Sequence, residues 1–233
     1  MNESPTPHPA LPAVEAALRA AMGEQLRIVS AEPVSGGSIH TALRLQDAGG
    51  ARFFAKLAPA AQAPMFEAEA DGLGAIAASG SLRTPAVIAR GGDEAHAILV
   101  LEWLDLQPLT SAADGARFAE ALAALHRNVG EHFGWPRDNF IGRTPQANTE
   151  RDNWARFFVE QRLRPQFARA RAQGFDIELQ RQADRLLDRV HALFLDYRPP
   201  ESLLHGDLWH GNAAVLADGT PVVFDPAVHR GHR

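Results

Sequence analysis

The chain has 233 residues, no cysteine and a formal net charge of −5, with 45% hydrophobic and 22% charged residues. This composition is ordinary for a globular protein with a sizeable core, and it excludes a disulfide scaffold and thiolate metal sites. No apolar run reaches the roughly 18 residues of a membrane-spanning helix, and no dense cluster of basic residues suggests a nucleic-acid surface. We therefore expect a cytoplasmic protein that binds neither membrane nor nucleic acid.

The first hundred residues predict a small lobe of strands with two helices. After a proline-rich, loose tail at residues 1–9, a helix is expected over 13–22, and a second begins near Pro64 and stops at Gly80. Short apolar runs bounded by turn residues predict five strands, at 26–29, 40–45, 53–57, 86–89 and 97–101.

The character of the sequence changes after the apolar segment 100–104, which we interpret as a linker. Long helices are expected after it, at about 113–128, 150–172 and 176–195. The segment 131–148 is rich in Gly, Pro and Asn, and it predicts a long loop of the kind that often carries function. Near the C-terminal end, residues 213–216 and 222–224 predict a hairpin.

The clearest chemical signal lies next to that hairpin. The run His205-Gly206-Asp207-Leu208-Trp209-His210-Gly211-Asn212 is followed, thirteen residues after its last member, by Asp225 at the end of an apolar strand. This spacing is typical of a phosphoryl-transfer site, in which Asp207 would orient and deprotonate an acceptor hydroxyl. Asn212 and Asp225 would hold Mg²⁺ on ATP, because Mg²⁺ prefers oxygen ligands. The motif therefore favours a kinase.

A single lysine supports this interpretation. Lys56 is the only lysine beside 22 arginines, and it lies in the apolar run 53–57. Kinases place a lysine on such a strand to reach the nucleotide phosphates. On the following helix, either Glu67 or Glu69 could pair with Lys56, and the alternative is that both belong to a solvated acidic face.

Two further segments are candidates for nucleotide binding. Between two predicted strands lie Gly36, Gly37 and Ser38. Glycines let backbone N–H groups approach phosphate oxygens, although a plain hairpin turn would also use them. The adenine would hydrogen-bond to backbone groups of the linker, at Glu102, Trp103 and Leu104.

These elements together predict an α+β, protein-kinase-like bilobal fold. Residues 1–104 would form a nucleotide-binding lobe with an antiparallel sheet and helices. Residues 105–233 would form a mostly helical lobe that holds the catalytic loop and the metal-binding aspartate.

The sequence also resembles one kinase family. The run from Leu203 to Asn212, together with Phe224-Asp225-Pro226-Ala227, is similar to the fructosamine kinase (ketosamine 3-kinase) family, which is related in fold to aminoglycoside phosphotransferases and choline kinases. The run 133–146, Phe-Gly-Trp-Pro-Arg-Asp-Asn-Phe-Ile-Gly-Arg-Thr-Pro-Gln, is a narrower match. The resemblance extends over roughly residues 13–233.

The resemblance implies ATP-dependent phosphorylation of the sugar 3-hydroxyl of a ketosamine, in a small molecule or a glycated protein, and hence a role in deglycation and repair. It implies that Asp207 is the base and that Asn212 and Asp225 bind Mg²⁺. It also favours Glu69 as the partner of Lys56.

The same resemblance places Trp209 and His210 at the substrate. For Trp209, the alternative is a core aromatic residue that braces the catalytic loop.

The chain also departs from the family pattern. His40 stands where many members have a small polar residue, and Val228-His229-Arg230 replaces a usual aromatic pair, which could alter the acceptor pocket. Relatives continue past the position of Arg233 with several more helices, so we expect a C-terminal lobe that is incomplete. The alternatives are another small-molecule kinase, with an aminoglycoside or choline-like acceptor, and a nucleotide-binding protein without turnover.

Overall fold

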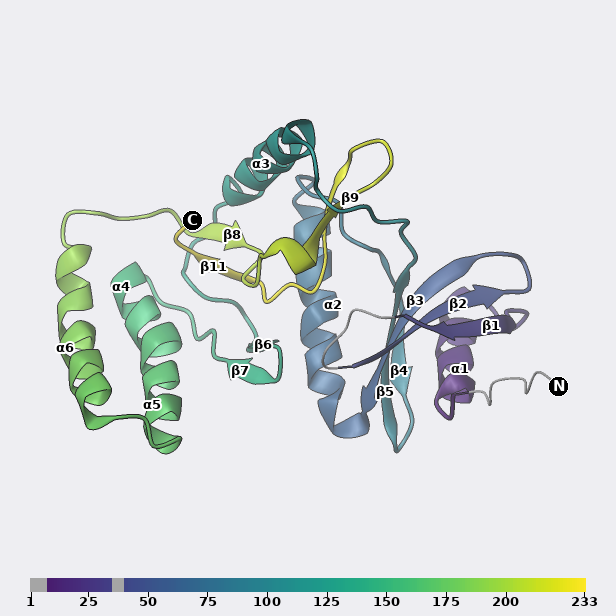
Figure 1. Cartoon of the computed structure of the whole chain (residues 1–233), viewed down its shortest axis with the longest axis horizontal. Coiled ribbons are helices and arrows are strands. Elements are labelled where there is room, and N and C mark those ends of the chain that lie inside the picture. The colour runs from purple at the N-terminus through teal and green to yellow at the C-terminus, as the bar shows by residue number, and fades with distance from the viewer. Residues whose placement is uncertain (1–7, 35–39) are drawn as a thin grey trace.

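The structure is a computed structural model that describes residues 8–34 and 40–233 (Figure 1). It has a mixed α+β architecture, with a five-stranded antiparallel sheet in one part and helices with short two-stranded sheets in the other. The expected fold class is therefore confirmed. The predicted phosphate loop at Gly36, Gly37 and Ser38 lies outside the described residues, as does most of the predicted tail, residues 1–7.

The N-terminal part consists of one sheet and two helices. The sheet has the order β1-β2-β3-β5-β4. Its strands are β1 (Ile28–Pro33), β2 (Thr41–Asp47), β3 (Arg52–Pro59), β4 (Val87–Gly92) and β5 (His96–Glu102). The helices are α1 (Leu11–Met22) and α2 (Ala63–Ala78), with a 3₁₀ turn η1 (Ala60–Gln62) before α2.

The two helices cover opposite faces of the sheet (Figure 1). Successive side chains of a strand point to opposite faces, so Ala55 and Leu57 of β3 pack in the cluster of α1. Phe54 and Ala58 pack in the cluster of α2. Lys56 has the same parity as Phe54 and Ala58, and it therefore points toward α2.

The C-terminal part contains the remaining helices and short strands. Its helices are α3 (Ala112–His126), α4 (Trp154–Phe157), the π-helical turn η2 (Phe158–Leu163), α5 (Arg164–Ala172) and α6 (Ile177–Leu193). Its strands are β6 (Asn139–Ile141), β7 (Thr144–Gln146), β8 (Ser202–Leu204), β9 (Ala213–Val215), β10 (Pro221–Val223) and β11 (His229–Gly231), with a 3₁₀ turn η3 (His210–Asn212). The predicted hairpin near the C-terminal end is present as β9–β10.

Three features differ from the sequence prediction. The helix expected to begin at residue 150 begins at Trp154, because the Asn153 side chain caps it by accepting from the Arg156 N–H at 2.9 Å. The expected loop 131–148 contains the hairpin β6–β7. The pairing of β8 with β11 was not predicted, because three-residue strands leave no alternating pattern and their partners are distant in sequence.

Helix α2 joins the two parts of the molecule. Ile76 at its C-terminal end packs with Leu125, Leu203 and Val228 of the helical part. One turn earlier, a Cβ on Gly72 would lie 3.0 Å from side-chain atoms of Pro226 and of Val228, so a glycine is needed for this close approach. The helix that carries Glu69 is thereby fixed against the segment that carries Asp225.

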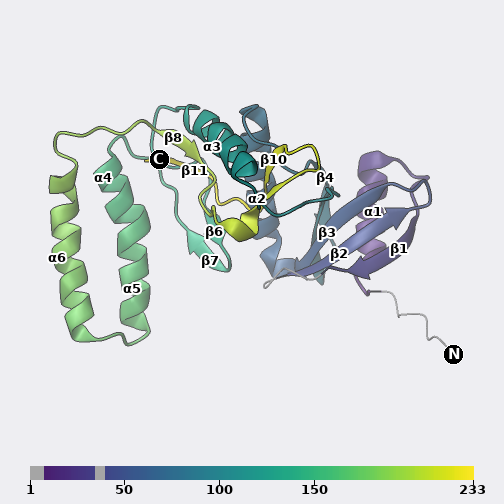
Figure 2. The same ribbon diagram turned by 45° about the horizontal axis from the view of Figure 1, so that its top comes forward.

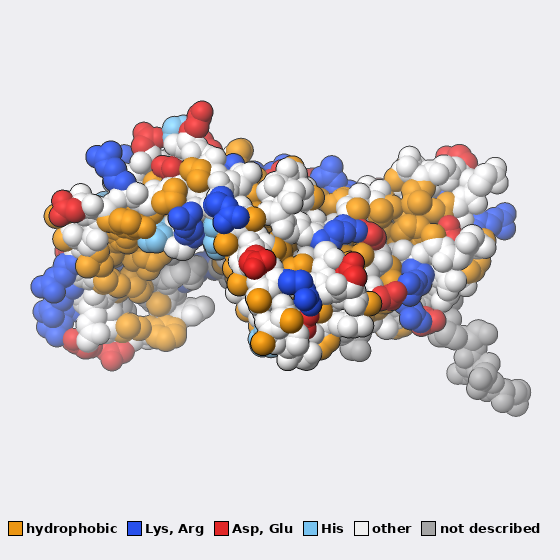
Figure 3. Space-filling view, turned by 90° about the horizontal axis from the view of Figure 1, so that it is seen from above, with side chains coloured by type: hydrophobic (Ala, Val, Ile, Leu, Met, Phe, Trp, Pro, Cys, Tyr) orange, Lys and Arg blue, Asp and Glu red, His pale blue; other side chains and the backbone are white. Residues whose placement is uncertain are grey.

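The α5–α6 hairpin extends away from the rest of the molecule (Figures 1 and 2). Its inner face packs around Leu187 and Val190. Several of its outer side chains are exposed, among them Ile177 (77%) and Leu193 (70%). Hydrophobic side chains gather at this end of the molecule (Figure 3). Within the described residues, no helix is both long enough and apolar enough to cross a lipid bilayer.

Candidate active site

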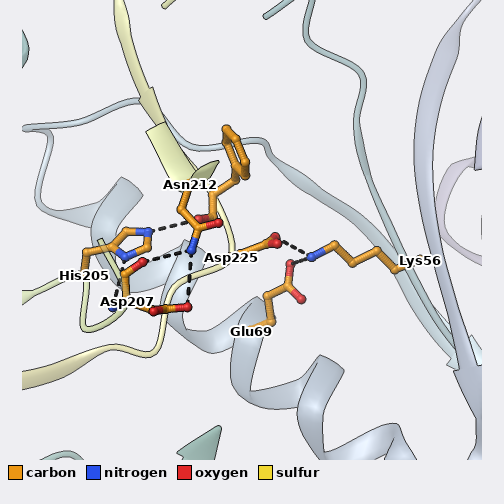
Figure 4. Close-up of polar contacts among 7 residues, drawn as sticks. Lys56, Glu69, His205, Asp207, Asn212 and Asp225 are labelled. Atoms are coloured by element: carbon orange, nitrogen blue, oxygen red, sulfur yellow. Dashed lines mark hydrogen bonds and ion pairs between the residues drawn. The ribbon is translucent and has the colours of Figure 1, made fainter. Parts of the chain in front are cut away.

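The predicted catalytic loop, residues 205–212, follows β8 and is anchored by His205. This side chain is 1% exposed. Its Nε2 lies 3.0 Å from the carbonyl oxygen of Phe224, and its Nδ1 accepts from the backbone N–H of Asp207 at 3.3 Å (Figure 4). Burial lowers the pKa of His205, so the imidazole is neutral at pH 7 and Nε2 is the donor. His205 is therefore a structural hydrogen-bonding residue of this loop.

Gly206 allows the loop to pass directly over the segment that carries Asp225. Its φ is +84° and a Cβ at this position would lie 1.9 Å from the carbonyl oxygen of Ala227. The two segments are joined there by the Ala227 N–H, which donates to the His205 carbonyl at 2.9 Å. No residue other than glycine fits this crossing without moving the backbone.

Asp207 and Asn212 form the centre of the loop. The amide Nδ2 of Asn212 donates to the backbone oxygen of Asp207 at 2.9 Å and lies 3.3 Å from its carboxylate Oδ2 (Figure 4). Asn212 is 5% exposed, whereas Asp207 is half-buried. The five-residue spacing thus closes a turn in which a buried amide orients a carboxylate that solvent can still reach.

Lys56 lies between two carboxylates from different parts of the chain. Its Nζ is 2.6 Å from Oε1 of Glu69 on α2, and it also ion-pairs with Asp225 (Figure 4). Glu67, the other candidate partner, instead lies 3.7 Å from Arg137. The structure therefore distinguishes the two acids that the sequence left open.

Burial and charge set the protonation of this cluster. Burial works against the Lys56 ammonium, but the Glu69 and Asp225 carboxylates outweigh it and raise the pKa of Lys56. Burial also raises the pKa of Glu69, which Lys56 opposes. The side chain of Asp225 is 46% exposed and that of Glu69 only 12%. Asp225 is therefore the acid that remains accessible to a ligand.

The residues around Asp225 fit a magnesium ion. Asp225 has φ 56° and is the only non-glycine residue with positive φ in the described part of the chain. Aspartate tolerates this conformation better than most residues. Because the nitrogen of the Asn212 amide faces Asp207, a cation would use its oxygen. A carboxylate and an amide oxygen are the hard ligands that Mg²⁺ prefers.

The side chains of the linker are engaged in local contacts. The carboxylate of Glu102 pairs with Arg83 and accepts from the Ala86 N–H at 3.1 Å. The indole N–H of Trp103 donates to Asp105 at 2.8 Å. Adenine binding by Glu102, Trp103 and Leu104 stays a prediction about their backbone groups.

Trp209 is a surface residue two positions after Asp207. It is 54% exposed, and its ring lies edge-on to His210 with centroids 4.6 Å apart. A Cβ on Gly211 would lie 2.4 Å from the indole, so the ring lies close over the backbone there. The interpretation of Trp209 as a core aromatic residue is therefore wrong.

Two residues near the site differ from the sequence-based expectation. Val228 and His229 are 1% and 7% exposed, so they belong to the core rather than to an open acceptor pocket. Asn139 and Gln146 lie in the run 133–146 that resembles the family, but the sequence assigned them no role. They are buried amides (4% and 8% exposed) that contact the segment after Asp225.

Comparison with known proteins identifies the family. The family model described as fructosamine kinase matches residues 10–233. The chain belongs to the fructosamine kinase family. It is 42% identical over 210 residues to a probable ketoamine kinase of Synechocystis, a match that covers 90% of this chain and 70% of that protein. Its identity to the probable ketoamine kinase YniA of Escherichia coli K12 is 36%, over 85% of this chain and 68% of the relative.

Solved structures agree with this assignment. A crystal structure from Haemophilus somnus, assigned as a fructosamine-3-kinase, matches 95% of this chain and 74% of its own length, with a TM-score of 0.85 and 27% identity. One from Thermobifida fusca with the same assignment has a TM-score of 0.80, with 33% identity over 94% of this chain and 75% of that one. The aminoglycoside phosphotransferase APH(4)-Ia shares the fold, with a TM-score of 0.59 and 15% identity over 93% of this chain and 72% of its own. As a member of this family, the chain is a phosphotransferase with an alcohol acceptor.

Proposed function

We propose that this chain is an ATP- and Mg²⁺-dependent kinase that phosphorylates the sugar 3-hydroxyl of ketosamines. The observation that carries the proposal is the convergence of Lys56 and Glu69 from the sheet and α2 with Asp207, Asn212 and Asp225 from the helical part (Figure 4). We assign nucleotide binding to residues 1–104 and acceptor binding and catalysis to residues 105–233.

Asp207 would act on the acceptor. The hydroxyl oxygen attacks the γ-phosphorus, its proton passes to the Asp207 carboxylate, and the bond from the γ-phosphorus to the bridging oxygen breaks to release ADP. The Asn212 amide, 3.3 Å from Oδ2, holds the carboxylate in one orientation for this transfer. A half-buried carboxylate suits the role because a substrate can reach it while its surroundings still hold it in place.

Lys56 and Glu69 would position the phosphates. Of the two carboxylates that pair with Lys56, Glu69 is more buried than Asp225. Glu69 would keep the Lys56 ammonium in place. Asp225 and Asn212 would hold Mg²⁺, which when bound neutralises the charge of the phosphate oxygens. The Asp225 carboxylate is suited to this because it is the exposed partner of Lys56.

Trp209 and His210 would form the acceptor side. An exposed indole face packs on the C–H surface of a sugar, and its N–H can donate to a hydroxyl. Phosphorylation at O3 makes the adduct unstable and releases the free amine. We therefore assign the chain to deglycation of small ketosamines or glycated proteins in the cytoplasm, where ATP and Mg²⁺ are available.

The test is ADP release from Mg-ATP with a ribulosyl-amine and a fructosyl-amine, with Asp207→Asn as the blank. We expect acceptor-dependent release from the wild type alone. Release that is independent of the acceptor, or absent with both amines, would overturn the proposed substrate class.

A further inference from the structure

The segment 224–228, which carries Asp225, has no strand ladder to hold it. It connects β10 to β11 in an irregular conformation. Asp225 has φ 56°, in the left-handed region that non-glycine residues rarely adopt, and Pro226 has no N–H to donate. The surroundings must therefore supply the contacts that fix this segment.

Two backbone bonds hold the segment, from the Phe224 N–H to the Asn212 carbonyl at 3.2 Å and from the Ala227 N–H to the His205 carbonyl at 2.9 Å. Buried side chains add contacts at both ends. At the start, His205 Nε2 lies 3.0 Å from the Phe224 carbonyl oxygen. At the end, Asn139 Nδ2 donates to the Val228 carbonyl at 2.7 Å, and Gln146 Nε2 lies 3.4 Å from the Ala227 carbonyl. The Ala227 carbonyl oxygen also lies 3.3 Å from the ring nitrogen Nδ1 of His229.

The side-chain amides of Asn139 and Gln146 also bond to each other. Asn139 and Gln146 face each other in the register of β6–β7, and Gln146 Nε2 donates to Asn139 Oδ1 at 2.9 Å. They are 4% and 8% exposed. Burying two amides costs free energy unless their hydrogen bonds are made, so an apolar pair would be the simpler choice for a hairpin that only filled space.

We propose that Asn139 and Gln146 are positioning residues that fix the carboxylate of Asp225 for Mg²⁺ binding. The hairpin β6–β7 acts through the backbone carbonyls of Ala227 and Val228, two and three residues beyond Asp225. The inference rests on the metal-binding role in the proposed function and is independent of the identity of the acceptor.

A control variant distinguishes a positioning role of the hairpin β6–β7 from a purely structural one. Asn148, two residues after Gln146, is also a buried amide, 0% exposed. Its side chain bonds to the Arg137 carbonyl at 3.1 Å and to Arg162 at 2.6 Å, away from residues 224–228. Asn148→Leu therefore removes a buried amide without touching the segment that carries Asp225.

The experiment measures metal binding directly. Mn²⁺ is titrated into the protein with a non-hydrolysable ATP analogue, and bound Mn²⁺ is counted by electron paramagnetic resonance. In Gln146→Met, which keeps the side-chain length, and in Asn139→Leu, we expect the Mn²⁺ concentration for half-saturation to rise about 10-fold, as for loss of a ligand-orienting contact. Affinity for the analogue without metal stays at the wild-type value, and Asn148→Leu lowers the melting temperature without shifting metal affinity.

Three outcomes would overturn the inference. One is wild-type metal affinity in a folded Gln146→Met protein, and another is an equal shift in Asn148→Leu. The third is absence of nucleotide-linked Mn²⁺ in the wild type. If the wild type binds the metal normally but phosphorylates no ketosamine, the proposed substrate class is wrong. The positioning role of Asn139 and Gln146 is then unaffected.

Discussion

The two sides of the site are held in place by different physical means. Lys56 lies in the middle of β3, paired with strands on both sides, and its position follows from the sheet register. Asp207 and Asp225 lie on irregular segments that buried histidine and amide side chains hold. Regular backbone pairing fixes a residue through many equivalent bonds, whereas the irregular segments depend on a few specific ones. Single substitutions should therefore disturb the second side more.

The largest effect is expected from removing the carboxylate of Asp207. Asp207→Asn should lower kcat by about 10²–10⁴-fold, as for removal of a general base. Mg-ATP affinity should stay near the wild-type value, because Asp207 is not among the contacts of Lys56. Single-turnover kinetics and calorimetry measure the two quantities, and lost ATP binding would contradict the role assigned to Asp207.

The next largest effect is expected where Gly206 passes over Ala227, at the contact between the two irregular segments. Gly206→Ala adds a Cβ against the Ala227 carbonyl in a left-handed conformation, and we expect it to lower the free energy of unfolding by about 3 kcal/mol or more. Gly80 also has positive φ (+65°), but an added Cβ meets nothing within 4 Å, so Gly80→Ala should cost only about 1 kcal/mol. Urea titration compares them, and equal losses would show that the crossing is not tight.

On the side of the site that strand pairing holds, a substitution should change the reaction rate more than the stability of the fold. Lys56→Met should lower kcat by about 100-fold, as for removal of one donor to a developing charge. Arg52→Met on the same strand breaks an exposed ion pair with Asp105 at 2.7 Å. Such pairs contribute little to stability, so we expect stability and rate near the wild-type values. Steady-state kinetics of both variants make the test, and an unaffected rate in Lys56→Met would contradict its assignment.

The smallest effect concerns pH. Burial, together with the nearby Arg162 guanidinium, lowers the pKa of His229 to about 3. The unfolded chain therefore takes up this proton first, and stability falls as pH drops below the unfolded pKa near 6.5, with the full penalty reached near pH 3. At pH 5 the expected loss is about 2 kcal/mol relative to pH 7.

His229→Gln should remove this part of the pH dependence. The comparison is the slope of unfolding free energy between pH 5 and 7, measured by urea titration in both proteins. Identical slopes would mean that His229 is not held neutral in the core. His205, whose pKa burial also lowers, should contribute a residual slope of the same sign to both proteins.

The sequence by itself determined the family-specific residues of the candidate site and most of the regular elements of the fold. The spacing from Asp207 to Asn212, the single lysine on an apolar strand and the periodicity of α1, α2 and α3 are local patterns, and each can be interpreted without knowing its neighbours. The structure places these elements where the patterns predicted them, with shifts of a few residues at the ends.

Only the tertiary structure decided between alternatives that depend on distant contacts. It placed Glu69 rather than Glu67 against Lys56, and it placed Trp209 at the surface. It also revealed the pairing of β8 with β11 and the amides Asn139 and Gln146 on the Asp225 segment. A hydrogen bond between residues some eighty positions apart leaves no periodic trace in the sequence, because its energy depends on burial and geometry that the complete fold creates.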